Sequence, residues 1–93
     1  MDRKEEVSRV LFGSEKRLDL LLAISRADDS ECYPTAMAEV SGVAAGATSV
    51  FMRKLADVDL LLPMKEEKGS TLRRYQKSDS VLWELVERLH EEL

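Results

Sequence analysis

Apolar residues recur in this chain either every three to four positions, which is typical of helices, or in short unbroken runs, which are typical of buried strands. The strongest helical pattern follows residue 13 and ends at the polar cluster of residues 28–30. Ser14 is the predicted N-cap of this helix, because its side chain can accept a hydrogen bond from the first turn. Apolar positions cover most sides of the helix, so we expect it in the middle of the fold. They are Leu18, Leu20, Leu21, Leu22, Ile24 and Ala27.

Two further helices are predicted after this one. Pro34, which a first helical turn tolerates, begins a short helix that Ser41 and Gly42 end. A longer periodic segment then covers residues 44–58. Two helices joined by a tight glycine-containing turn indicate a helix-turn-helix arrangement.

Extended structure and a last helix are predicted for the rest of the chain. Residues 60–62 are consecutive leucines and indicate a buried strand, whose end Pro63 confines to an edge position. Residues 66–70 predict a turn and residues 71–77 a returning strand, so residues 60–77 form a hairpin. Asp79 or Ser80 caps the last helix, and Trp83 lies near one edge of its apolar stripe. That stripe consists of Leu82, Leu85, Val86, Leu89 and Leu93.

The predicted fold class is mainly α with a small β-hairpin. Ninety-three residues provide one core, so we expect residues 1–93 to form a single domain. It consists of a three-helix core, a two-stranded hairpin and a C-terminal helix. Residues 1–13 are an N-terminal arm or short helix, and residues 79–93 are a helix that is also a candidate dimer interface.

The order of these elements resembles the winged helix-turn-helix domains of small bacterial and archaeal repressors of the ArsR, MarR and PadR kinds. The resemblance covers roughly residues 11–89, and residues 11–18 are similar to the start of the family's first long helix. Residues 41–43 resemble the turn and residues 46–55 the recognition helix. Residues 60–61 and 73–75 resemble the two strands of the wing. Asp59 stands where the family commonly has glycine, and Asp accepts left-handed geometry better than most other residues.

The resemblance implies a transcriptional regulator that binds double-stranded DNA sequence-specifically, with the helix 44–58 in the major groove and the wing 60–77 on the backbone. Helical spacing allows two buried arcs in residues 44–58, and one of them would bury Lys54 without a partner, which is costly. The other arc buries Ala47, Thr48, Phe51, Met52, Leu55 and Val58. It leaves Gly46, Ser49, Val50, Arg53, Lys54 and Asp57 outside.

The outward residues suit contacts in the major groove. Arg53 can bind guanine through two hydrogen bonds, Ser49 can reach a base edge or a phosphate, and Val50 can pack on a thymine methyl group. Gly46 lets the backbone at the helix start approach a phosphate. An ordinary solvated face is the alternative for all of them. The remaining candidate DNA-binding residues are Lys54, Lys65, Lys68, Arg73 and Arg74.

The net charge of −4 argues against DNA binding when the chain is taken as a whole. The charge is unevenly distributed along the chain. Residues 53–77 have a net charge of +3, whereas residues 1–52 have −3 and residues 78–93 have −4. Positive charge is therefore concentrated where phosphate contacts are needed. Glu66 and Glu67 at the hairpin tip are unfavourable beside a phosphate, which leaves a second hypothesis open: a protein–protein interaction module that does not bind DNA.

Composition and the start of the chain argue against other classes. No apolar run approaches the ~18–20 residues of a membrane span, and no secretory signal is present, so we expect a cytoplasmic protein without membrane contact. One Cys and one His leave too few ligands for a zinc site within the chain. We expect no enzyme activity, no cofactor and no metal. A redox role of Cys32, whose pKa Asp28, Asp29 and Glu31 would raise, and a metal role of His90 across a dimer are alternatives to structural roles.

A homodimer and a repressor function are expected as well. One module of this kind buries too little surface for specific affinity. Dimerisation through the last helix, joined by residues 3–12, would place two recognition helices about one DNA turn (~34 Å) apart. Because there is no room for a ligand-binding domain, an effector would bind at the dimer interface or be a protein co-regulator.

Overall fold

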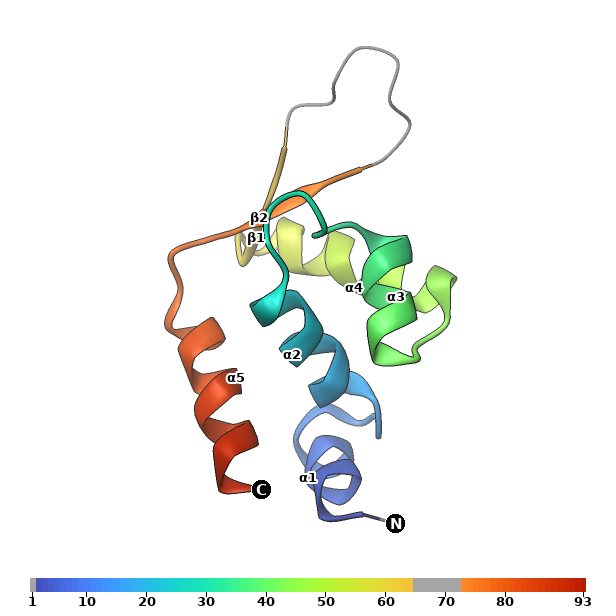
Figure 1. Cartoon of the computed structure of the whole chain (residues 1–93), viewed down its shortest axis with the longest axis vertical. Coiled ribbons are helices and arrows are strands. Elements are labelled where there is room, and N and C mark those ends of the chain that lie inside the picture. Colours follow the sequence, from blue (N-terminus) through green and yellow to red (C-terminus); the bar gives the residue numbers. More distant parts are fainter. Residues whose placement is uncertain (1, 65–72) are drawn as a thin grey trace.

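The computed structural model describes residues 2–64 and 73–93, which form five helices and a two-stranded antiparallel sheet (Figure 1). The predicted class, mainly α with a small hairpin, is confirmed. No helix in these ranges is long and apolar enough to cross a membrane. The elements are α1 (Arg3–Phe12), α2 (Arg17–Arg26), α3 (Pro34–Ser41), α4 (Ala45–Asp57), β1 (Leu61–Pro63), β2 (Tyr75–Lys77) and α5 (Val81–Glu92).

The start of α2 differs from the prediction. The cap residue is Lys16, which makes no side-chain capping bond, so the N-cap predicted at Ser14 is wrong. The reason is tertiary: the fully buried Ser8 of α1 donates its hydroxyl to the Ser14 carbonyl (2.6 Å) and accepts the Leu18 amide (2.9 Å). One helix thus supplies the hydroxyl that satisfies the first turn of the next, and Ser14 stays in the connecting turn.

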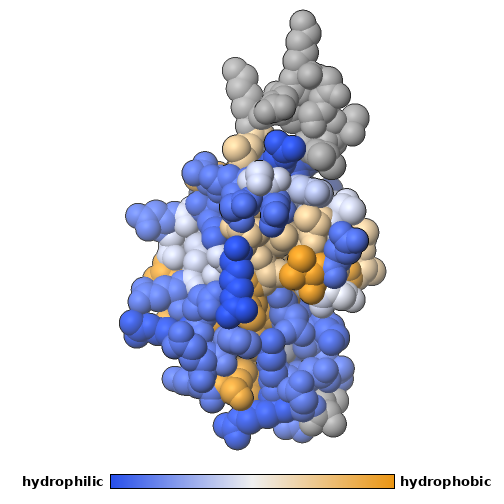
Figure 2. All heavy atoms as spheres, in the orientation of Figure 1, coloured by the Kyte–Doolittle hydropathy of each residue, from blue (hydrophilic) through white to orange (hydrophobic). Residues whose placement is uncertain are grey.

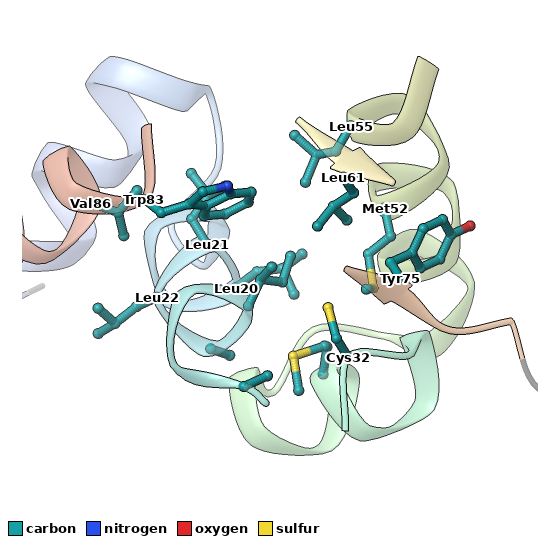
Figure 3. Close-up of a cluster of buried hydrophobic side chains, with 14 of the residues drawn as sticks. Leu20, Leu21, Leu22, Cys32, Met52, Leu55, Leu61, Tyr75, Trp83 and Val86 are labelled. Atoms are coloured by element: carbon teal, nitrogen blue, oxygen red, sulfur yellow. The ribbon is translucent and has the colours of Figure 1, made fainter. Parts of the chain in front are cut away.

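α2 is the central element, as its apolar circumference predicts. Leu18, Leu20 and Ile24 have no exposed surface, and α1, α3 and α5 all pack against this helix. Figure 3 shows Cys32, Met52 and the other labelled residues converging on the same core from the α2–α3 loop, α4, the sheet and α5. The core therefore joins every element except α1 around α2.

The hairpin begins with a left-handed turn. Asp59 has φ +62°, which is the geometry expected of the residue in the place of a glycine. β1 and β2 pair antiparallel with Leu61 opposite Lys77 and Pro63 opposite Tyr75. The Tyr75 amide also donates to the Cys32 carbonyl at 2.8 Å, so the loop after α2 supports the sheet. The predicted turn at residues 66–70 and the start of the returning strand at residues 71–72 lie outside the described residues.

α5 begins as predicted, and most of its apolar stripe packs on the core. Ser80 caps it by accepting the Leu82 amide at 3.2 Å. Val86 is buried together with Trp83, and Leu82 and Leu89 pack against the core, whereas Leu85 is 53% exposed. The indole of Trp83 lies between α5 and α2 beside Leu21 (Figure 3). This large ring thus adds to the part of α5 that packs on the core.

The buried hydroxyl of Ser8 leads to the first prediction. Ser8→Ala removes the acceptor of a buried amide and the donor to a carbonyl, so we expect the free energy of unfolding to fall by ~1–3 kcal/mol. Urea unfolding followed by circular dichroism measures the change. Ser49→Ala, at an exposed position of α4, is the control and should stay within ~0.5 kcal/mol of wild type. Equal values for the two variants would contradict the bridging role.

Candidate nucleic-acid interface

The turn between α3 and α4 determines where α4 begins. Pro34 occupies the first turn of α3, as predicted, and Gly42 ends the helix with φ +79°. The Gly42 amide donates to the Ala38 carbonyl at 2.9 Å, and the Ser41 hydroxyl accepts the Val43 amide at 3.2 Å. These local bonds reverse the chain within a few residues and bring the start of α4 beside α3.

The inward face of α4 is narrower than predicted. Thr48, Met52 and Leu55 are buried and Phe51 is half-buried, which confirms the centre of the predicted arc. Val58 is 64% exposed, because it follows the last helical residue and no longer obeys helical spacing. Ala47 is also exposed, since it lies at the edge of the arc beside a surface hollow. The two predictions of burial for Ala47 and Val58 are therefore wrong.

All six residues predicted to face outward are exposed: Gly46, Ser49, Val50, Arg53, Lys54 and Asp57. The backbone at Gly46 is open, since a Cβ atom built there would meet nothing within 4 Å. Ala44, the cap residue of α4, makes no side-chain capping bond. The amides of the first turn are thus available to an external acceptor.

Two hollows connect the hairpin side of α4 with the hairpin. The first, about 350 Å³, is lined by Arg53 and Asp57 of α4 and by Arg73 and Arg74. The second, about 460 Å³, is lined by Arg73, Ser49 and Gly46 together with Tyr33 and Thr35 at the start of α3. Arg73 lines both hollows, so the structure brings it together with Gly46, Ser49 and Arg53. The hydroxyls of Tyr33 and Thr35 were not predicted as part of this surface.

A third hollow lies on the other flank of the outward face of α4. It has about 310 Å³ and is lined by Gly46, Val50 and Lys54, together with Phe51 and Arg17. The guanidinium carbon of Arg17, at the start of α2, lies 4.0 Å from the centroid of the Phe51 ring. No local sequence pattern could indicate this cation–π contact, because the two residues belong to different helices.

The cations around α4 have no described carboxylate partner, unlike most of the described cations elsewhere. Among residues 2–64 and 73–93, the ion pairs lie on α1, α2, α5 and the turn between α1 and α2. No described carboxylate lies within 4.0 Å of a cationic nitrogen on the surface around α4. Its cationic residues are Arg17, Arg53, Lys54, Arg73 and Arg74. Lys65 and Lys68, also predicted to bind DNA, lie outside the described residues.

The remaining candidate residues lie in other parts of the fold. Cys32 is 1% exposed, and burial is the main cause that raises the pKa of its thiol to about 11. Asp29 adds to the rise and Lys77 opposes it, so the acidic neighbours predicted as the cause are secondary. His90 is partly buried in α5. No group of three or more potential metal ligands lies together in the part of the chain that is described.

Comparisons of the chain with protein-family models, with curated protein sequences and with solved structures found no match.

Two glycines near the start of α4 yield opposite predictions. Gly42→Ala forces a side chain into left-handed geometry, so we expect it to lower the free energy of unfolding by about 1 kcal/mol. Gly46→Ala adds a Cβ to a helix in open space, so it should raise stability by ~0.5–1 kcal/mol. Chemical denaturation of both variants checks the signs. Effects of the same sign would contradict this account of the turn.

Proposed function

We propose that this chain is a winged helix-turn-helix transcriptional regulator that binds double-stranded DNA. The observation that carries the proposal is the outward face of α4, which two hollows connect to Arg73 and Arg74 and whose cations have no described carboxylate partner. α4 enters the major groove, and the hairpin contacts the phosphate backbone.

The chemistry of the α4 face suits a base-reading role. Ser49 and Arg53 are four residues apart and therefore lie on one side of the helix. Arg53 can donate two hydrogen bonds to guanine, and the methyl groups of Val50 can pack on thymine. The open amides at Gly46 favour a phosphate, because they lie at the positive end of the helix dipole.

Charge placement supports the same function. Residues 53–77 have a net charge of +3 in a chain whose total is −4. Neutralising phosphates with these cations releases counterions, which supplies affinity at low salt. The acidic remainder repels DNA and limits non-specific binding, which suits a protein that must distinguish one site from many.

We further propose that the protein acts in the cytoplasm as a homodimeric repressor. α1 and α5 leave apolar side chains uncovered, with Val10 83% and Leu11 57% exposed on α1 and Leu85 53% exposed on α5. Both chain termini lie at the end of the molecule opposite the hairpin (Figure 1). A two-fold axis near α5 leaves α4 of each copy accessible, so two helices can reach successive major grooves of a pseudo-palindromic site.

Arg53 provides the direct test. A site is first selected by the wild-type protein from a random duplex pool, and binding to it is measured by fluorescence anisotropy. Arg53→Ala should weaken binding to this site by ~1–3 kcal/mol and relax the base preference. Arg26→Ala, which removes the same charge from an exposed position at the end of α2, is the control and should bind within about twofold of wild type.

Two outcomes would contradict the proposed sequence-specific binding of DNA. Identical affinities of Arg53→Ala and wild type for selected and scrambled sites would remove the assignment of α4. Absence of wild-type binding to random duplex even at about 50 mM salt would favour the protein-interaction alternative, because electrostatic attraction is strongest at low salt.

The dimer yields a separate prediction. Wild type should have a solution mass of about 21 kDa by light scattering, which is twice the chain mass of 10.5 kDa. Leu85→Glu places a charge in the proposed interface and should yield a monomer. Val40→Glu makes the same change at a 72% exposed position of α3 and should remain dimeric. A monomeric wild type, or a dimer that Leu85→Glu leaves intact, would contradict this interface.

A further inference from the structure

The side of α4 that faces away from the hairpin has its own cationic hollow. Lys54 of α4 and Arg17 of α2 line it, and Val50 and Phe51 complete the wall. Successive helical residues are about 100° apart around the helix axis. Lys54 and Ala47 therefore lie on one flank of the outward face of α4, whereas Ser49 and Ala56 lie on the other flank. The hollow therefore adds positive charge on the flank of α4 other than the one that Arg73 and Arg74 line.

Arg17 is held in place by an aromatic ring. Its guanidinium carbon lies 4.0 Å from the Phe51 ring centroid, so one face of the planar group is occupied while its N–H edges remain available to another partner. Its nitrogens have no carboxylate within 4.0 Å in the described part of the chain. A positioned guanidinium with available donors suits a phosphate oxygen.

The position of Arg17 in its helix gives an independent reason. It is the first residue of α2 and follows the cap residue Lys16, which makes no side-chain capping bond, and the Ser8 hydroxyl accepts only the Leu18 amide of this turn. A cation at the N-terminal end of a helix interacts unfavourably with the helix dipole, because the positive end of that dipole favours an anion. The charge of Arg17 thus does not serve the stability of α2, whereas a phosphate beside it would interact favourably with both the guanidinium and the helix end.

We propose that Arg17 and Lys54 bind a phosphodiester of the DNA strand that runs along the side of α4 away from the hairpin. A helix in the major groove lies between two phosphate backbones. Arg73 and Arg74 serve one strand, and Arg17 and Lys54 serve the other, so α4 is held between two sets of phosphate contacts. This inference rests on the proposed function. It assigns a phosphate contact to Arg17, which the sequence pattern did not indicate as a DNA-binding residue.

The test is the salt dependence of binding to a random-sequence duplex, measured by anisotropy. Each lost phosphate contact lowers the slope of log K against log salt concentration by about 0.9 in magnitude. Arg17→Gln and Lys54→Gln should each show this loss and bind several-fold more weakly. Arg26→Gln changes the net charge equally at the opposite end of α2 and should keep the wild-type slope. Thermal melting identifies folded variants, and Lys54→Gln, at an exposed position, carries the test if Arg17→Gln does not fold.

Phosphate-ethylation interference on the selected site shows which DNA strand each set of cations contacts. Arg17→Gln and Lys54→Gln should remove interference at phosphates of one strand, and Arg73→Gln at phosphates of the opposite strand. Wild-type slopes for both Arg17→Gln and Lys54→Gln, or an equal loss in Arg26→Gln, would overturn the inference. If Arg53→Ala still weakens binding to the selected site, the proposed function stands without it. If wild type binds no duplex, the proposed function itself fails.

Discussion

Burial of α2 on nearly all sides is the constraint on which the other elements depend. α1, α3 and α5 pack against this helix, and Leu18, Leu20 and Ile24 are fully enclosed. Emptying one such position costs ~2–5 kcal/mol, which is a large part of the ~5–15 kcal/mol that stabilises a typical domain. Because α3 packs on α2 and α4 packs on α3, the rotation of α4 follows from this core. The outward set of α4 is therefore a consequence of how α2 is buried.

The hairpin is fixed to the same helix by polar contacts at its base. The Lys77 ammonium donates to the Ser25 carbonyl near the end of α2, where it also interacts favourably with the helix dipole. Ser25 donates its hydroxyl to the Trp83 carbonyl of α5 at 3.3 Å, and Arg26 binds Glu87 through bonds of 3.0 and 3.2 Å. The end of α2 thus joins the sheet to α5. The same helix also packs against α3. On the face shown in Figure 2, apolar surface forms a narrow central strip and patches toward the edges, within a mainly hydrophilic exterior.

Local chemistry made part of this arrangement predictable. The Ser80 cap and the outward positions of α4 depend on a few neighbouring residues, whereas the left-handed Asp59 was expected from the resemblance to the winged helix-turn-helix domains. The features that were missed depend on contacts between elements. Ser8 of α1 accepts the Leu18 amide in the first turn of α2, and Trp83, at the edge of the predicted stripe of α5, is buried while Leu85 is exposed. Neither spacing nor propensity contains that information, because several residues of similar type compete for one place in the core.

Charge separation connects the fold to the proposed function. The cations of α1, α2 and α5 described in ion pairs are neutralised by acidic partners, whereas the surface around α4 keeps its positive charge without a described acidic partner. A molecule with net charge −4 and one cationic face has a strong dipole, and the field of a polyanion turns that face toward it before contact. A uniformly basic domain would gain affinity at every site and lose this orientation. In the proposed function, acidic residues far from α4 would therefore contribute to recognition by making other approaches to DNA unfavourable.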